Sequence, residues 1–166
     1  MFSFLYKKEN VGFTLQFDDA PSEPIEIAHA VSVPSSFANI NVSEPNISNL
    51  YKGVQLIEVS LEEIAWGRSG DKGNKANIGI IARHPNLLPH IWDTFSEEKI
   101  VEIFSHFLEN DKIDRHYLPG ISGVNYVLHD VLGGGGTTSL RNDPQGKGYA
   151  QILLSCKISV PKNLLV

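Results

Sequence analysis

The chain has 166 residues, of which 42 % are hydrophobic, enough for one well-buried core with an extension but not for two full domains. Its formal net charge of −5 argues against a nucleic-acid binder, which needs a basic surface to neutralise phosphates. No apolar run is long enough to cross a bilayer, and residues 1–6 are too short for the core of a signal peptide, so we expect a cytoplasmic protein without membrane contacts.

Residues 1–55 are predicted to be an N-terminal extension, because prolines stand among serines and asparagines there and no long helical period occurs. Within it, Phe13, Leu15 and Phe17 alternate with polar residues, which predicts a half-buried strand over residues 12–17. A further strand could occupy residues 25–33. These strands could pair with the main sheet or with a neighbouring subunit.

Residues 56–166 are predicted to be the main domain, in which strands are interleaved with helices. Pro85 to Trp92 suggests a short helix, and a capping box from Thr94 to Glu97 indicates the start of a second helix. The expected inward stripe of this second helix consists of Ile100, Ile103, Phe104, Phe107 and Leu108. The predicted strands cover residues 54–59, 64–66, 77–83, 113–118, 124–132 and 149–160.

This order of elements fits an α+β sandwich with helices on one face of a mainly antiparallel sheet. The single cysteine, Cys156, excludes an internal disulfide and lies in an apolar run, so we expect a core thiol. Residues 137–143 could form either a short helix or an ordered loop.

Two glycine-rich polar segments stand out, which we call the first segment (residues 67–79) and the second segment (residues 133–148). Glycine lets the backbone approach another group closely, at an entropic cost that a merely structural loop would seldom repeat so often. Both segments follow predicted strands, so they could meet at one end of the sheet. We therefore expect them to form the functional surface.

The first segment places cations among glycines whose exposed amides could form a nest for phosphate or carboxylate. Neither the Walker nor the Rossmann phosphate motif can be placed on it, and the alternative is a tight solvated hairpin with ordinary turn residues. Its candidate ligand-binding residues are Arg68, Ser69, Gly70, Lys72, Gly73 and Asn77.

The second segment contains four successive glycines, followed by hydroxyl groups and an arginine of the kind that hold an oxyanion. An apolar strand precedes it, so close approach of its backbone to another group explains the glycines better than a flexible linker does. Its candidate ligand-binding residues are Gly134, Gly135, Thr137, Thr138, Ser139, Arg141 and Lys147.

His129 and Asp71 are the acid/base candidates. His129 precedes the glycine run and could act as a general base, with Asp71, Asp130 or Asp143 orienting it or acting in its place. The alternative for His129 is a structural hydrogen bond. No close-spaced histidine pair or serine-nucleophile elbow occurs, so we expect neither a metal nor a cofactor, and whether the protein is an enzyme stays open.

The runs AWGRSGDKG and ANIGIIAR, together with NYVLHDVLGGG, SLR and DPQGKG, closely resemble the C-terminal region of the AtuA family of acyclic terpene utilisation proteins. This resemblance, over about residues 56–156, implies a ferredoxin-like fold. Members that resemble this domain usually carry it behind a much larger N-terminal domain and occur in bacterial degradation of citronellol and geraniol through acyl-CoA intermediates. The resemblance therefore implies that this chain is a stand-alone accessory domain, or a subunit that completes the site of a large AtuA-type partner.

Our first hypothesis is a domain that binds an anionic metabolite, such as an acyl-CoA or a carboxylate, at the paired segments and acts with that partner. The rival is a non-catalytic structural or oligomerisation module, whose glycine-rich segments pack in a protein interface. A homo-oligomer is expected, since an unpaired edge strand invites a second chain.

Overall fold

The computed structural model describes residue 7 and residues 10–26, 42–136 and 138–165. Contacts divide the chain into two units, residues 1–41 and 42–166, which we treat separately. Within the described residues, no helix combines the length and the apolar character that crossing a membrane requires.

The first unit contains an antiparallel pair of short strands, β1 (Phe13–Leu15) and β2 (Glu23–Ile25). The predicted strand at residues 12–17 is therefore confirmed at its centre. All six strand residues are exposed, so the buried face predicted for this strand is not found among the described residues. The other predicted strand, at residues 25–33, lies mostly outside the described residues.

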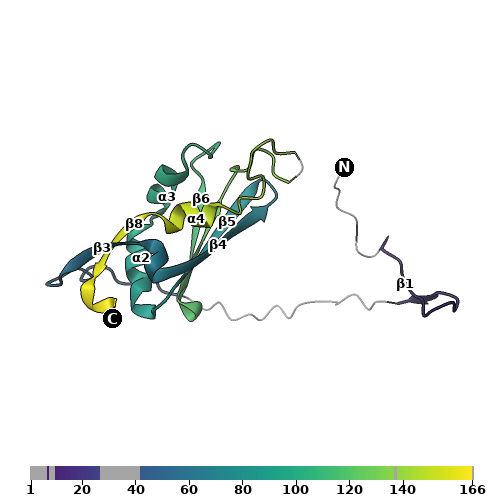
Figure 1. The fold of residues 1–166 in the computed structure, drawn as a ribbon, viewed down its shortest axis with the longest axis horizontal. Helices are drawn as coiled ribbons and strands as arrows, with labels where there is room; N and C mark the ends of the chain where they lie inside the picture. Colours follow the sequence, from purple (N-terminus) through teal and green to yellow (C-terminus); the bar gives the residue numbers. More distant parts are fainter. Residues whose placement is uncertain (1–6, 8–9, 27–41, 137, 166) are drawn as a thin grey trace. The chain divides into compact units, whose positions relative to one another are not determined.

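The second unit is built on two antiparallel sheets (Figure 1). β3 (Leu56–Ser60) pairs with β8 (Lys157–Pro161) in the smaller sheet. The larger sheet has the strand order β4-β5-β7-β6, so β4 and β6 are its edges. Its strands are β4 (Ala65–Lys72), β5 (Lys75–Ala82), β6 (Ile113–Leu118) and β7 (Gly123–Leu128).

One face of the larger sheet forms the core. Alternate residues of its two central strands, such as Ile78, Ile80 and Tyr126, are buried under the helices. The Tyr126 hydroxyl donates to the Phe95 carbonyl at 2.9 Å, and burial raises the pKa of that hydroxyl. The helices are α1 (Leu61–Ile64), α2 (Leu88–Thr94), α3 (Glu97–Phe104) and α4 (Tyr149–Leu154), with 3-10 turns η2 (Pro85–Leu87), η3 (Pro119–Ile121) and η4 (Lys162–Leu164). The α+β prediction is confirmed.

The start of α3 differs from the sequence prediction. Its N-cap is Ser96, whose hydroxyl accepts from the Lys99 amide at 3.3 Å, and not Thr94. A capping box occurs instead at α1, between Ser60 and Glu63. The predicted inward stripe is confirmed, although the helix ends at Phe104 and the last part of the stripe belongs to the following turn.

The predicted strand over residues 149–160 is wrong in its first half, because α4 precedes β8. Tyr149, Ala150 and Leu153 are buried at the spacing of a helix. The apolar run in the sequence fits both the period of a helix and that of a strand, so it does not decide between them. Cys156 lies between the two elements and is only partly buried; burial raises the pKa of its thiol. Residues 138–143 contain turns and bends rather than a helix.

Candidate functional site

The first segment is a β-hairpin and not a loop. Residues 67–72 belong to β4 and residues 75–79 to β5, and the two strands pair along their whole length around a turn at Gly73 and Asn74. The predicted nest of free amides is wrong for this reason, and the hairpin alternative is confirmed. What the segment presents to a ligand is therefore a surface of side chains on a strand pair.

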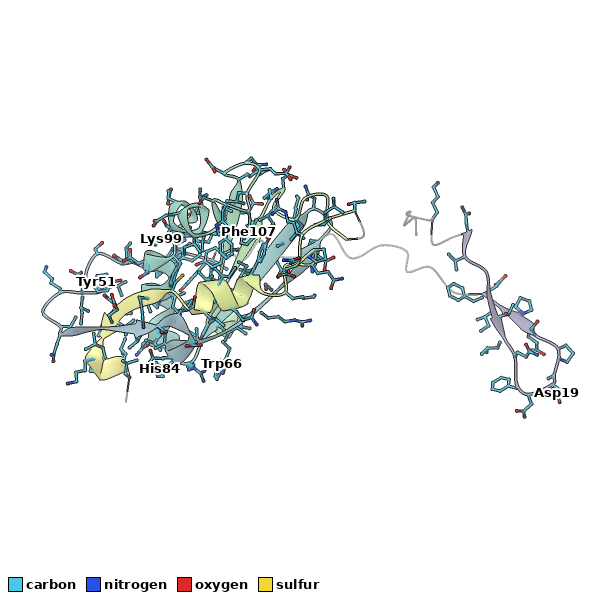
Figure 2. All side chains as sticks on the ribbon, turned by 45° about the horizontal axis from the view of Figure 1, so that its top comes forward. Asp19, Tyr51, Trp66, His84, Lys99 and Phe107 are labelled. Carbon is cyan, nitrogen blue, oxygen red and sulfur yellow. The ribbon has the colours of Figure 1, made fainter. Side chains whose placement is uncertain are left out.

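Alternate residues of the larger sheet point away from the helices and form what we call the open face. A pocket of about 720 Å³ lies on it. Figure 2 labels Trp66, one of the residues of this face, at the rim of the second unit. The open-face residues that line the pocket are Trp66, Arg68, Gly70, Lys72, Asn77, Gly79, Ile81, His116, Leu118 and Asn125.

The middle of the pocket is a row that crosses all four strands, formed in register by Arg68, Gly79, Asn125 and His116. Gly79 is its floor, since a Cβ atom added there would come no closer than 3.8 Å to another atom. Beside this row, the Asn77 amide donates to the Asn125 side-chain oxygen at 3.1 Å. Glycine thus leaves a hollow between charged and amide groups.

One end of the pocket is apolar. Trp66, Ile81 and Leu118 lie in the next row, and Ile121 of η3 adjoins them. The exposed fractions of Trp66 and Ile121 are 55 % and 57 %. The Arg83 guanidinium lies 4.6 Å from the centre of the Trp66 ring, an arrangement that favours a fixed ring orientation.

The other end of the pocket is cationic. Lys72 lines it, and Lys147 reaches it from the second segment, with its Nζ 3.0 Å from where a Cβ on Gly70 would lie. Lys147 Nζ is also 4.0 Å from an Asp71 oxygen. The buried Ser69 connects β4 to the second segment and to α4. Its hydroxyl donates to the Lys147 carbonyl at 3.0 Å and accepts from the Ala150 amide at 2.9 Å.

The second segment clamps the tip of the first, so the two segments meet as predicted. The Gly134 amide donates to Asn74 Oδ1 at 2.7 Å, and the Val131 amide donates to the Asn74 carbonyl at 3.0 Å. Gly135 has a φ of +68° and packs directly on Gly73, where an added Cβ would overlap the Gly73 carbonyl. Close backbone approach is therefore the reason for this glycine.

Apart from Lys147, the charged and hydroxyl side chains described in the second segment bond within the protein. Arg141 Nη1 donates to the carbonyls of Phe107 at 2.9 Å and Val131 at 2.6 Å. The Thr138 hydroxyl donates to the Gly135 carbonyl at 2.8 Å, and the Ser139 hydroxyl accepts from the Arg141 amide at 3.3 Å. None of these donors lines the pocket.

The predicted ligand-binding residues thus fall into two groups: those that line the pocket, and those in the contact between the two segments, which we call the clamp. The pocket contains Arg68, Ser69, Gly70, Lys72, Asn77 and Lys147. The contact between the two segments contains Gly73, Gly134 and Gly135. Thr137 lies outside the described residues.

His129 has a different partner from those predicted. Its Nε2 lies 2.6 Å from Asp114 Oδ2, and the hydrogen bond from His129 is the main reason that the pKa of Asp114 is lowered. Asp130 instead accepts from Asn74 and Asn110 side chains. The Asp143 carboxylate accepts from the amides of residues 147 and 148, and Asp71 lies near Lys147. Neither His129 nor Asp114 lines the pocket.

The model of the AtuA ferredoxin-like domain family matches residues 59–159, which is more than half of the chain. The chain belongs to this family. The match runs from β3 to β8 and includes both glycine-rich segments, and the predicted ferredoxin-like fold is confirmed. No curated protein and no solved structure matches the chain.

Within this AtuA ferredoxin-like domain, the sequence prediction missed His116, Asn125 and Gly79. They lie on three strands, and only the strand order places them beside Arg68. Among the described residues, no three histidine, cysteine, aspartate or glutamate side chains gather as metal ligands.

Proposed function

We propose that this AtuA ferredoxin-like domain binds an organic anion, of the acyl-CoA or carboxylate type, on its open face. It acts there as an accessory domain or subunit, together with a partner protein, in terpenoid or acyl-CoA catabolism. The observation that carries the proposal is the pocket of about 720 Å³, which has a cationic end and an apolar end. Its size lies within the range of small-molecule sites.

The charges support an anionic ligand. The chain as a whole carries a net charge of −5, yet Arg68, Lys72 and Lys147 all line one pocket. The Lys147 side chain is more than half exposed, so its charge is available to a ligand in the pocket. An arginine beside two lysines favours carboxylate or phosphate oxygens, which accept charge-assisted hydrogen bonds.

The uncharged groups support an organic ligand over a bare inorganic ion. The bond between Asn77 and Asn125 uses the Asn125 oxygen and leaves the Asn125 amide nitrogen to donate to a carbonyl or hydroxyl group. Trp66 and Leu118 offer apolar surface a few residues away on the same face. A hydrocarbon chain covering them removes that surface from water, which contributes to binding.

Calorimetric titration with octanoate and octanoyl-CoA tests the site. Arg68→Gln removes the central cation and weakens binding at least about tenfold. Gly79→Val fills the pocket floor and abolishes binding without straining the backbone. Ser139→Ala, in the second segment, is the matched control and binds like the wild type. Equal affinity in all four chains, or no heat with the wild type at millimolar ligand, contradicts the proposal.

The partner is tested separately. Affinity purification of the tagged chain from its source cells should recover a protein that resembles the large N-terminal domain of AtuA proteins, identified by mass spectrometry. Its presence with the wild type and its loss with Trp66→Ser would place the contact near the pocket. Recovery of no such protein under several growth conditions counts against the subunit role.

The second candidate function is a docking module without a small ligand. The exposure of Trp66 and Ile121 on one face favours it, because exposed aromatic and aliphatic groups that gather in one place mark interaction surfaces. This alternative predicts that Trp66→Ser and Ile121→Ser reduce protein association, while no titration with octanoate or octanoyl-CoA gives saturable heat.

A further inference from the structure

The two edges of the larger sheet differ. The β4 edge lies beside the second segment and α4, which bond to Ser69 through the Lys147 carbonyl and the Ala150 amide. The β6 edge pairs with β7 on one side only, and no other described strand pairs with it. Its six residues contain neither proline nor lysine, two of the residue types that protect an edge, although Asp114 and Arg115 are charged. Among the described residues, β6 therefore has one edge to which another strand can add.

The direction of the free backbone groups follows from one hydrogen bond. The His129 amide donates to the Lys112 carbonyl at 3.1 Å, and the β6–β7 register places Lys112 opposite His129. Backbone groups alternate in direction along a strand, so the even-numbered residues of β6 bond to β7. The amides and carbonyls of Ile113, Arg115 and Tyr117 then point outward, away from the sheet.

We propose that β6 pairs antiparallel with β6 of a second copy of this chain, about a twofold axis at Arg115. In this register, the outward groups of Ile113, Arg115 and Tyr117 all find partners in Tyr117, Arg115 and Ile113 of the second copy. The two larger sheets become one continuous antiparallel sheet. This inference goes beyond the proposed anion site and does not depend on it.

Charge selects this register over its neighbours. With the axis at Arg115, Asp114 lies directly opposite His116 of the second copy, and the reciprocal pair forms as well. A shift that centres the pairing on Asp114 would oppose two carboxylates, and one centred on His116 would oppose two imidazoles. An imidazole opposite a carboxylate can donate a hydrogen bond to it, whereas two carboxylates that face each other across strands repel.

The arginine at the axis does not prevent this pairing. Arg115 lies on the helix-covered face, where its guanidinium is 3.6 Å from the centre of the Trp92 ring and donates to the Trp92 carbonyl at 2.6 Å. Glu97 lies 3.2 Å from its Nε. Each Arg115 charge is thus turned inward and compensated within its own copy.

The pairing changes the pocket. His116 and Leu118 line the pocket and lie on the strand that the second copy would extend. Asp114 of the second copy would lie beside His116, so each pocket would gain a carboxylate at its β6 margin, at the opposite edge of the sheet from Arg68 and Lys72 on β4. The second copy then contributes a residue to the site.

Disulfide trapping tests the contact and its register. In a Cys156→Ser background, Asp114→Cys and His116→Cys are prepared as separate chains and oxidised alone and as an equal mixture. Opposed residues of a strand pair lie within disulfide range. We expect the mixture to give a covalent dimer containing one chain of each kind, while each chain alone gives at least about tenfold less. Electrophoresis without reductant and mass spectrometry identify the products.

Each other outcome overturns the proposal. Covalent dimers from Asp114→Cys alone or from His116→Cys alone would establish a different register. The absence of covalent dimers from the mixture, with the wild type monomeric by light scattering at high concentration, would exclude the contact. A monomeric chain that still binds octanoyl-CoA would leave the anion site standing, so the two proposals fail separately.

Discussion

The two glycine-rich segments look alike in sequence and differ in the structure. In the first segment, every glycine except Gly73 lies within a strand, and Gly79 keeps the floor of the pocket free of side chains. In the second segment, residues 133–136 all have positive φ and bring the backbone against the turn at Gly73. The first segment presents most of the polar surface of the pocket, and the second segment holds the turn of the first in place and adds Lys147 to the pocket.

This difference shows that a glycine-rich composition does not by itself identify a binding loop. Arg68 and Arg141 both belong to glycine-rich segments that also contain serine. Arg68 lines the pocket, whereas Arg141 donates to two backbone carbonyls under the second segment. The role of each cation follows from what its strand or loop packs against.

The largest effect is expected from Gly135→Ala. The added methyl group would overlap the Gly73 carbonyl at a positive φ, so the free energy of unfolding should fall by about 3 kcal/mol or more. Gly136→Ala is the matched control: its φ is also positive, but nothing lies within 4 Å, and about 1–2 kcal/mol is expected. If urea denaturation gives the same loss of unfolding free energy for both variants, the close contact between Gly135 and Gly73 does not stabilise the fold.

Asn74→Ala should have the next largest effect. It removes the bonds of the Asn74 side chain to the Gly134 amide and to Asp130, which should cost about 1–3 kcal/mol. Hydrogen exchange should accelerate at the Gly134 amide and not at the β5 amides. Unchanged exchange at Gly134 would show that the second segment keeps its position without Asn74.

The stability of the protein at acid pH should depend on a residue outside both segments, His90. Burial lowers the pKa of His90 below 6.5, and its Nδ1 has no hydrogen-bond partner. The unfolded chain therefore binds more protons, and stability falls as the pH drops through about 6.5 and below. Thermal melting of His90→Leu should depend less on pH than that of the wild type. The melting temperature of Asn74→Ala should depend on pH as that of the wild type does. A weaker dependence would mean that groups around Asn74 contribute to the pH dependence.

The smallest effect on stability is expected from Gly79→Val. The backbone at this position has no positive φ, and the nearest atoms to an added Cβ are 3.8 Å away. The free energy of unfolding should change by less than about 1 kcal/mol. A loss as large as that of Gly135→Ala would mean that both segments use glycine for close packing.

The fold was predictable from the sequence to the extent that it depends on local pattern. β6 follows residues 113–118 as predicted, since the turn that begins at Pro119 and Gly120 is a local signal for the end of the strand. α4 was missed, because the apolar run after Tyr149 fits both periods and only packing on β4 decides between them. The strand order could not be read from one sequence.

The candidate site depends on that strand order. Arg68, Lys72 and Asn77 were identifiable because they stand among glycines, but His116 and Asn125 join them only through pairing of strands distant in sequence. The partnership of His129 with Asp114 was missed for the same reason: Asp114 is adjacent across the β6–β7 ladder and not along the chain.

The most direct test of the different roles of the segments is a nuclear magnetic resonance titration of the ¹⁵N-labelled chain with octanoyl-CoA. The account predicts saturable shifts at the amides of Arg68, Gly79, Asn125 and His116, with little change at Gly134 or Arg141. Saturable shifts confined to residues 133–141, with the open face unchanged, would contradict it.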